Sequence, residues 1–214
     1  VNEEADFYSD NLRIEGENMF FDFNFDGKTE EFSWEIPGIH NVENATAAIS
    51  ILYNLNVDFE TIKKGISTFK GIKRRYTKHS FANGKIYVDD YAHHPTELNA
   101  VIGSIRTFNP GKKLLVAFQP HLFSRTRDFA DGFAESLAQA DELLLLDIYP
   151  ARELQKDFEG ITSDWLLEKV NLDKKEVCSL SQAFDKIKEK DFDVLLTVGA
   201  GNIDTLYDPI MNWL

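Results

Sequence analysis

The sequence predicts an α/β fold, in which a Rossmann-like domain with a mostly parallel sheet flanked by helices follows a β-hairpin and a helical segment. From about residue 80, short apolar runs alternate with amphipathic, helix-length segments, a pattern typical of parallel strands covered on both faces. Before about residue 70, alternating aromatic residues give way to a helical pair. The basic segment 71–80 between these parts has little strand pattern and is interpreted as a link between two domains.

The first part of the chain is expected to form a β-hairpin followed by two helices. In NMFFDFNF the aromatic residues alternate, and FDGKTEEFSWEI has the pattern of a hairpin with its turn at Asp26 and Gly27. The letters GKT at 27–29 also occur in phosphate-binding loops, but such a loop needs a glycine where this chain has Asp22. From Asn44 the apolar spacing is helical, and Asp58 is predicted to cap a second helix.

The second part is expected to alternate strands and helices. The predicted strands are short and apolar, and they cover residues 85–91, 113–119, 142–149, 176–180 and 193–199. The predicted helices carry apolar residues at helical spacing, and they cover residues 95–108, 125–140, 163–170, 181–190 and 204–214. In the second of these helices, Phe129, Phe133 and Leu137 are expected to lie in the core.

Polar residues gather directly after four of the predicted strands, at residues 89–94, 119–125, 147–153 and 199–202. Parallel sheets bind ligands outside the carboxyl ends of their strands. These four segments are therefore expected to converge on one edge of the sheet and to form a site there. The last of them, in VGAGN, lacks the full G-x-G-x-x-G pattern and is interpreted as a turn near a ligand.

Composition restricts the class of partner. The chain has 214 residues, 43% of them hydrophobic, and a formal net charge of −13. This charge argues against a nucleic-acid-binding or membrane-binding surface, because both need a basic face. The single cysteine, Cys178, cannot form an internal disulfide and fits a cytoplasmic protein, and no apolar run is long enough to span a bilayer. The opening residues resemble the middle of a domain, so the chain is expected to be a fragment. Its oligomeric state is not predicted.

Three kinds of site compete for the segment VDDYAHHPTEL at residues 88–98. A metal site would draw on five residues of suitable type, namely Asp89, Asp90, His93, His94 and His121. However, no H-x-x-x-H or H-E-x-x-H helix pattern is present. A hydrolase triad would need Ser124, which lacks the G-x-S-x-G context and is expected to cap the following helix. A substrate-positioning site is favoured, because Arg125 can clamp a carboxylate or phosphate and His121 can orient a carboxylate or amine.

Five motifs, taken together and in this order, resemble one family. They are GIHNVENATAA, GIKRRYTKH, VDDYAHHPTEL, FQPHLFSRT and DIYPARE, which lie between residues 38 and 153, and the resemblance extends over about residues 35–203. The sequence is similar to the Mur ligases of peptidoglycan synthesis. The resemblance implies that residues 1–75 are the C-terminal part of the central, ATP-binding domain and that residues 76–214 are the C-terminal Rossmann-like domain. The family's UDP-sugar domain and P-loop have no counterpart here, so the chain alone is expected to be inactive.

The resemblance also assigns residues to an ATP site. These are Asn41, Asn44, Arg75 and Asp90. The two asparagines would contact the adenine, whose edge offers both a donor and an acceptor. The arginine would reach the nucleotide phosphates, and the aspartate would contact the ribose hydroxyls. Asn41 also has the side chain and position of a helix N-cap, and the two roles are compatible.

The amino-acid site that the resemblance implies consists of Tyr91, His93, His121 and Arg125. Arg125 would bind the carboxylate, and one of the candidate catalytic residues, His93 or His121, would accept the proton of the amine. His94 and Pro95 would set the turn into the next helix. Leu122 stands where many relatives have arginine, which leaves Arg125 as the main carboxylate anchor. The DIYPARE segment, with Asp147 and Arg152, receives no role, and no metal ligand is assigned in this chain.

The implied reaction is ATP-dependent ligation of L-alanine to UDP-N-acetylmuramate through an acyl phosphate. ATP and Mg²⁺ are the implied cofactors, with the metal ligands mainly outside this chain. Three alternatives remain open at this point. The first is a ligase that recycles an intact tripeptide onto the same UDP-sugar. The second is a non-catalytic nucleotide-binding or amino-acid-binding module, and the third is the metal-dependent hydrolase considered above.

Overall fold

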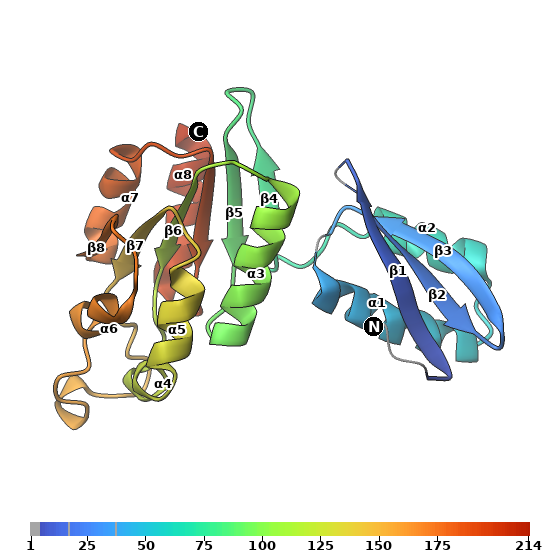
Figure 1. The fold of residues 1–214 in the computed structure, drawn as a ribbon, viewed down its shortest axis with the longest axis horizontal. Helices are drawn as coiled ribbons and strands as arrows, with labels where there is room; N and C mark the ends of the chain where they lie inside the picture. The colour runs from blue at the N-terminus through green and yellow to red at the C-terminus, as the bar shows by residue number, and fades with distance from the viewer. Residues whose placement is uncertain (1–4, 17, 37) are drawn as a thin grey trace. The chain divides into compact units, whose positions relative to one another are not determined.

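The computed structural model describes residues 5–16, 18–36 and 38–214. The chain divides into two compact units, Val1–Gly71 and Ile72–Leu214 (Figure 1). The division lies a few residues before the predicted boundary between 75 and 76, because residues 72–75 are tied to the second unit. The backbone N–H of Tyr91, for example, donates to the carbonyl oxygen of Arg74 at 2.8 Å. Each unit is described by itself.

The first unit is an antiparallel sheet of three strands with two helices. The strands are β1 (Phe7–Glu15), β2 (Asn18–Phe25) and β3 (Lys28–Trp34), and the helices are α1 (Ile39–Asn54) and α2 (Phe59–Thr68). The predicted hairpin is confirmed, because Asp26 and Gly27 form its turn with φ of 47° and 69°. Two successive positive φ angles are the geometry that closes two-residue hairpins. The GKT letters thus belong to a turn that continues into a strand.

Aromatic side chains fill the core of the first unit. The alternation predicted for β2 is present, since Phe21, Phe23 and Phe25 are buried. Phe59 of α2 approaches Phe25 with ring centroids 4.8 Å apart. Such aromatic pairs add about 0.5–1.5 kcal/mol beyond the burial of their area. Asp58 caps α2 as predicted, its side chain accepting the backbone N–H of Thr61 at 2.9 Å.

The second unit contains a mixed sheet of six strands. Their spatial order is β4 (Thr77–Ser80), β5 (Ile86–Asp90), β9 (Val194–Val198), β6 (Leu114–Phe118), β7 (Glu142–Leu146) and β8 (Lys175–Cys178). All neighbours are parallel except β4, which pairs antiparallel with β5. The predicted α/β class is confirmed. The prediction that 71–80 is poor in strand was wrong for β4, because an edge strand needs a pairing partner rather than an apolar pattern of its own.

Helices cover both faces of this sheet (Figure 1). One face carries α3 (Pro95–Phe108), α5 (Ala130–Leu137) and α6 (Ser163–Lys169). The other face carries α7 (Leu180–Lys188), the 3₁₀ turn η2 (Asn202–Leu206) and α8 (Tyr207–Trp213). Two shorter elements, α4 (Phe123–Asp128) and the 3₁₀ turn η1 (Gln155–Asp157), follow β6 and β7. Within the described ranges, no helix has the length and apolar character that a membrane crossing requires.

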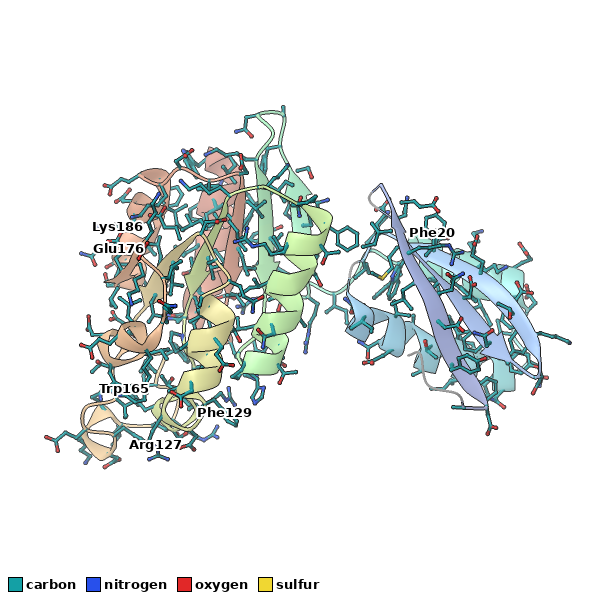
Figure 2. All side chains as sticks on the ribbon, in the orientation of Figure 1. Phe20, Arg127, Phe129, Trp165, Glu176 and Lys186 are labelled. Carbon is teal, nitrogen blue, oxygen red and sulfur yellow. The ribbon has the colours of Figure 1, made fainter. Side chains whose placement is uncertain are left out.

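The helix predicted over 125–140 is interrupted. Phe129, with φ −117° and ψ 19°, ends α4 and precedes α5. Phe133 and Leu137 are buried as predicted, but Phe129 is 43% exposed and is not a core residue (Figure 2). Its ring instead lies 4.6 Å from that of His94. Helical spacing alone did not reveal this break, because the deviation is confined to one residue.

The position of β9 determines where a site can form. The chain leaves β5 through α3 and returns to the sheet as β6, and only much later does β9 insert between these two strands. This reversal of strand order is the feature at which α/β sheets bind ligands. The carboxyl ends of β5, β9 and β6 therefore lie side by side.

A buried polar row links two of these strands. Asp89 at the end of β5 is 1% exposed, and its Oδ1 accepts the hydroxyl of Thr197 on β9 at 2.8 Å. The same threonine hydroxyl is 2.8 Å from the hydroxyl of Tyr87, which is fully buried. Burial raises the pKa of Asp89 from 3.8 to about 6, and the hydrogen bond from Thr197 and the positive charge of Arg74 only partly oppose this shift.

The glycine loop after β9 is packed too closely to accept a side chain. At Gly199, where φ is +143°, a Cβ atom would lie 2.5 Å from the carbonyl oxygen of Gln119. The Gln119 side chain in turn accepts the backbone N–H of Ile203 at 2.9 Å and donates to Asn202 at 2.9 Å. The backbone of this loop therefore packs closely against Gln119, which follows β6.

Replacing Gly199 by alanine tests this contact. Gly199→Ala should lower the free energy of unfolding of the second unit by about 1–3 kcal/mol, because backbone strain and overlap with Gln119 add together. Gly103→Ala is the matched control, since this glycine lies in α3 with open space around it. The control should be stabilised by about 0.5–1 kcal/mol through helix propensity. Urea denaturation of both variants measures the difference, and equal effects would contradict the close contact.

A second prediction concerns pH. Because the folded state binds the Asp89 proton more tightly than the unfolded chain does, its stabilising effect is present below about pH 4 and is lost as pH rises through about 6. Relative to Asp89→Asn, the wild-type chain should lose roughly 3 kcal/mol of unfolding free energy between about pH 4 and about pH 7. Denaturation of both proteins at a series of pH values measures this change. A difference that stays constant with pH would rule it out.

Candidate functional site

The four polar segments predicted to converge do so. Residues 89–94, 119–125 and 199–202 follow the adjacent strands β5, β6 and β9. The fourth segment, after β7, joins them through a bridge between His121 and Tyr149. The backbone N–H of Tyr149 donates to Pro120 at 2.8 Å, and that of Leu122 donates back to Tyr149 at 2.9 Å. The site is therefore built from strand ends that are fixed by main-chain hydrogen bonds.

The four residues assigned to the amino-acid site form one continuous row. Ring centroids are 5.4 Å apart between Tyr91 and His93 and 6.2 Å apart between His93 and His121. On its other side, His121 stacks on Tyr149 at 5.6 Å. Arg125, one helical turn further on, places its Nη1 3.4 Å from Nδ1 of His121. A guanidinium and two imidazoles are thus brought together from two strand ends.

The two histidines differ in the partners of their ring nitrogens. Nδ1 of His93 lies 3.0 Å from the carbonyl oxygen of Tyr91. A carbonyl can only accept, so Nδ1 carries the proton and the lone pair of neutral His93 is on Nε2. Nδ1 of His121 faces the guanidinium of Arg125, which can only donate. His93 therefore offers a base at Nε2, whereas the Nδ1 lone pair of His121 is engaged by Arg125.

His121 is kept neutral by its surroundings. Burial lowers the pKa of His121 below its usual value, and the positive charges of Arg125 and Arg152 add to this effect. A neutral imidazole beside a guanidinium leaves the positive charge of the site on the arginine. This arrangement suits an anionic group, such as a carboxylate, at Arg125.

The helix that carries Arg125 is capped by a residue from another segment. α4 begins after Leu122, an apolar residue with φ 70° that provides no capping side chain. Instead, Oε2 of Glu153 accepts the backbone N–H of Ser124 at 3.0 Å, and Oε1 accepts its hydroxyl at 2.5 Å. The prediction that Ser124 is the cap was wrong. Glu153 gives the DIYPARE segment a role that its sequence did not reveal.

The pKa of Glu153 agrees with this capping role. Burial alone would raise the pKa of this carboxyl, but the hydrogen bonds from Ser124 overcome that effect and lower it. Glu153 is therefore ionised at neutral pH. A carboxylate at the start of a helix is stabilised by the unpaired backbone N–H groups there.

The residues assigned to ATP fall in both units. Asn41 and Asn44 lie on one side of α1 in the first unit, three positions apart. The N-cap of that helix is Gly38, so the expected capping by Asn41 was wrong. In the second unit Arg75 is exposed and Asp90 is buried. The Asp90 carboxylate accepts the backbone N–H groups of Tyr76 and Ala92, each at 2.7 Å, which fixes its orientation.

His94 sets the turn into α3, as expected. It is the N-cap residue, and Glu97 accepts its backbone N–H in a capping box. Glu97 also accepts the backbone N–H of His93 at 2.8 Å. One carboxylate therefore orders both histidines of the motif, and only His93 faces the row of site residues.

The sequence did not reveal that Arg74 forms ion pairs at this edge of the sheet. Arg74 has φ 60°, and its guanidinium lies between the carboxylates of Asp89 and Asp204 at 3.6 and 3.5 Å. In the described part of the chain, no three His, Cys, Asp or Glu residues are arranged to hold a metal ion. The metal-dependent hydrolase therefore has no candidate centre among these residues.

Comparison with known proteins adds to this geometry. UDP-N-acetylmuramate–L-alanine ligases from Flavobacterium johnsoniae and Cytophaga hutchinsonii are 44% and 46% identical to the chain over 215 and 209 residues. These alignments cover 100% and 97% of the chain but only 47% and 44% of the relatives, so the chain spans about half the length of the curated relatives it matches.

A solved structure and a family model point the same way. The UDP-N-acetylmuramate–alanine ligase of Thermotoga maritima superposes with a TM-score of 0.81 at 23% identity, covering 99% of this chain and 46% of that one, which supports the fold. The family model described as "Mur ligase, glutamate ligase domain" matches residues 74–201, more than half of the chain and the whole row of site residues in the second unit. By this match, the chain belongs to the Mur ligase family.

Proposed function

We propose that this chain is part of a ligase that uses ATP to join L-alanine to UDP-N-acetylmuramate in peptidoglycan precursor synthesis. One observation carries the proposal above the others, namely that Arg125 lies beside His121, whose ring faces that of His93, at the switch point of the sheet. Relatives bearing that activity in their names are 44% and 46% identical to the chain, which supports the same assignment. We place the protein in the cytoplasm on the same grounds.

Arg125 is proposed to bind the carboxylate of L-alanine. Its side chain is partly exposed at the start of α4, and the helix is fixed by Glu153. A guanidinium binds a carboxylate through two parallel N–H donors, which fixes direction as well as distance. The amine of the bound amino acid would then lie toward His93 and His121. This arrangement orients a small amino acid by its charged ends rather than by its side chain.

The reaction needs an uncharged amine. In the proposed reaction, the amine nitrogen attacks the carbonyl carbon of an acyl phosphate, a C–N bond forms and phosphate leaves. The nitrogen must also lose a proton, and a base with a lone pair near neutral pH supplies this most effectively. His93 offers its lone pair at Nε2, because its Nδ1 donates to the carbonyl of Tyr91. We therefore assign the proton acceptance to His93.

His121 has a related part in this proposal. Its Nδ1 accepts from Arg125 in the structure. A substrate carboxylate would draw the guanidinium toward itself, and the Nδ1 lone pair would then be available to hydrogen-bond the amine. Binding of the amino acid and orientation of its amine are coupled in this way through one arginine.

ATP is proposed to use Asn41 and Asn44 for its adenine, Asp90 for its ribose and Arg75 for its phosphates. The fixed, buried carboxylate of Asp90 suits a pair of ribose hydroxyls. When bound, ATP and Mg²⁺ supply the phosphoryl group and neutralise its charge. The metal ligands are proposed to lie mainly outside this chain. UDP-N-acetylmuramate is likewise proposed to be held elsewhere.

The first test measures phosphate release by the protein at the full length of its relatives. With ATP, Mg²⁺ and UDP-N-acetylmuramate present, release should depend on added L-alanine. A response only to an intact tripeptide would assign the recycling reaction instead. No release with any acceptor, from protein shown to be folded and to bind ATP, would contradict the ligase assignment.

Arg125→Ala is predicted to raise the KM for L-alanine by about 10-fold to 150-fold, the loss of a charge-assisted hydrogen bond worth roughly 1.5–3 kcal/mol. The KM for ATP should change little. Arg127→Ala is the matched control, because this arginine lies on the same helix and pairs with its exposed neighbour Asp128. Steady-state kinetics with each substrate varied in turn measures both constants. Equal effects of the two substitutions would remove Arg125 from the proposed carboxylate site.

His93→Gln should act on a different constant. If His93 accepts the amine proton, kcat should fall by about 100-fold to 10,000-fold while the KM for L-alanine changes little. A higher pH should partly restore the rate, because more of the amine is then uncharged in solution. His94→Gln is the comparison, since its side chain belongs to the cap of α3. A rate for His93→Gln that equals that of His94→Gln would assign the proton transfer to another group.

A further inference from the structure

We propose that Arg74 is a positioning residue for the amino-acid site, because its guanidinium, fixed by Asp89, Asp204 and the carbonyl of Gly199, holds the ring of Tyr91 in place. The proposal rests on the proposed function, because it names how one side of that site is ordered. It does not require Arg74 to touch a substrate. The matched family domain begins at this residue, at the start of the second unit.

Three separate elements fix the guanidinium. Its Nη2 donates to the carbonyl oxygen of Gly199 after β9 at 2.5 Å. Its Nη1 lies 3.5 Å from a carboxylate oxygen of Asp204 in η2, and its Nε lies 3.6 Å from one of Asp89 on β5. The side chain is only 14% exposed. A cation buried between two carboxylates and a carbonyl has one preferred place, because any other would leave unpaired charges.

The same guanidinium lies over the ring of Tyr91. The guanidinium carbon is 4.9 Å from the ring centroid, within the range of a cation–π contact. The main chain adds a second connection, because the backbone N–H of Tyr91 donates to the carbonyl of Arg74 at 2.8 Å. Tyr91 is 37% exposed, so little else covers its ring on the solvent side. Without the Arg74 side chain, the backbone of Tyr91 would stay in place, but the orientation of its ring would no longer be fixed.

The position of Tyr91 in turn affects His93, the residue proposed to accept the amine proton. The carbonyl oxygen of Tyr91 accepts from Nδ1 of His93, and the two rings meet edge to face. That hydrogen bond determines which nitrogen of His93 carries the lone pair. Arg74 therefore acts on the base through the ring of Tyr91. A shift of the Tyr91 segment would displace His93 together with it.

Arginine is suited to this position and lysine is not. A planar guanidinium can stack on a ring with its face while its edge donates to Gly199 and faces the two carboxylates. A lysine ammonium keeps the charge, but it is a point charge and cannot do all of these at once. The Nε atom has no hydrogen-bond acceptor within the described residues, although Asp89 lies beside it. The contact is therefore one of charge and shape rather than of a complete hydrogen-bond set.

Arg74→Lys tests the proposal through a double-mutant cycle with Tyr91→Ala. In the full-length protein, Arg74→Lys should lower kcat/KM for L-alanine by about 5-fold to 30-fold and leave the KM for ATP within about 2-fold. In the Tyr91→Ala background, Arg74→Lys should have no further effect on kcat/KM for L-alanine, because the ring it positions is absent. Arg127→Lys, an exposed arginine outside the site, is the control and should behave like wild type.

Three outcomes would overturn the proposal. If the effects of Arg74→Lys and Tyr91→Ala multiply independently, Arg74 supports the fold and does not act through the ring. If the KM for ATP rises instead, Arg74 serves the nucleotide. A separate readout needs no activity, namely the NMR signals of the Tyr91 ring in the 214-residue chain, which should shift in Arg74→Lys and not in Arg127→Lys. Unchanged ring signals would overturn the positioning role even if the ligase assignment stands, and a shift without any ligase activity would contradict only the proposed function.

Discussion

The insertion of β9 between β5 and β6 is the constraint on which the second unit depends. It places Asp89 next to Thr197 and brings the backbone of Gly199 against Gln119, so that two strand ends far apart in sequence become neighbours. Only glycine fits at that contact. Because β9 is hydrogen-bonded on both sides, the edge from which the site residues extend has little freedom to move. The site is thus supported by the sheet rather than by flexible loops.

Charge in this region is organised locally and does not follow the net charge of the chain. The chain carries −13, yet the site is centred on two arginines. Arg74 is matched by Asp89 and Asp204, whereas Arg125 lies beside the neutral ring of His121. A compensated guanidinium is suited to holding structure, and one beside a neutral imidazole is suited to receiving an anion. This difference separates the two roles assigned to them.

Much of this arrangement was predictable from sequence. The alternation of apolar strands and amphipathic helices indicated the sheet, and polar strand ends indicated its active edge. The features that the sequence pattern could not predict depend on single backbone angles or on partners far away in the sequence. β4 forms because β5 offers an edge, Phe129 interrupts a helix through one residue, and Ser124 bonds to Glu153 from a distant segment. Arg74 turns inward through a positive φ that neighbouring letters do not encode. In each case a tertiary contact outweighed a local preference.

The two sides of the proposed amino-acid site have independent supports. On one side Arg74 fixes Tyr91, and Tyr91 fixes the tautomer of His93. On the other side Glu153 caps α4, and α4 carries Arg125. The two meet only where His93 and His121 face each other. Because the supports share no residue, disturbing one should change proton transfer or amine placement while disturbing the other changes carboxylate binding. In the proposed function, a site divided in this way would hold the carboxylate of a small amino acid firmly while its amine remains free to reach the reacting carbon.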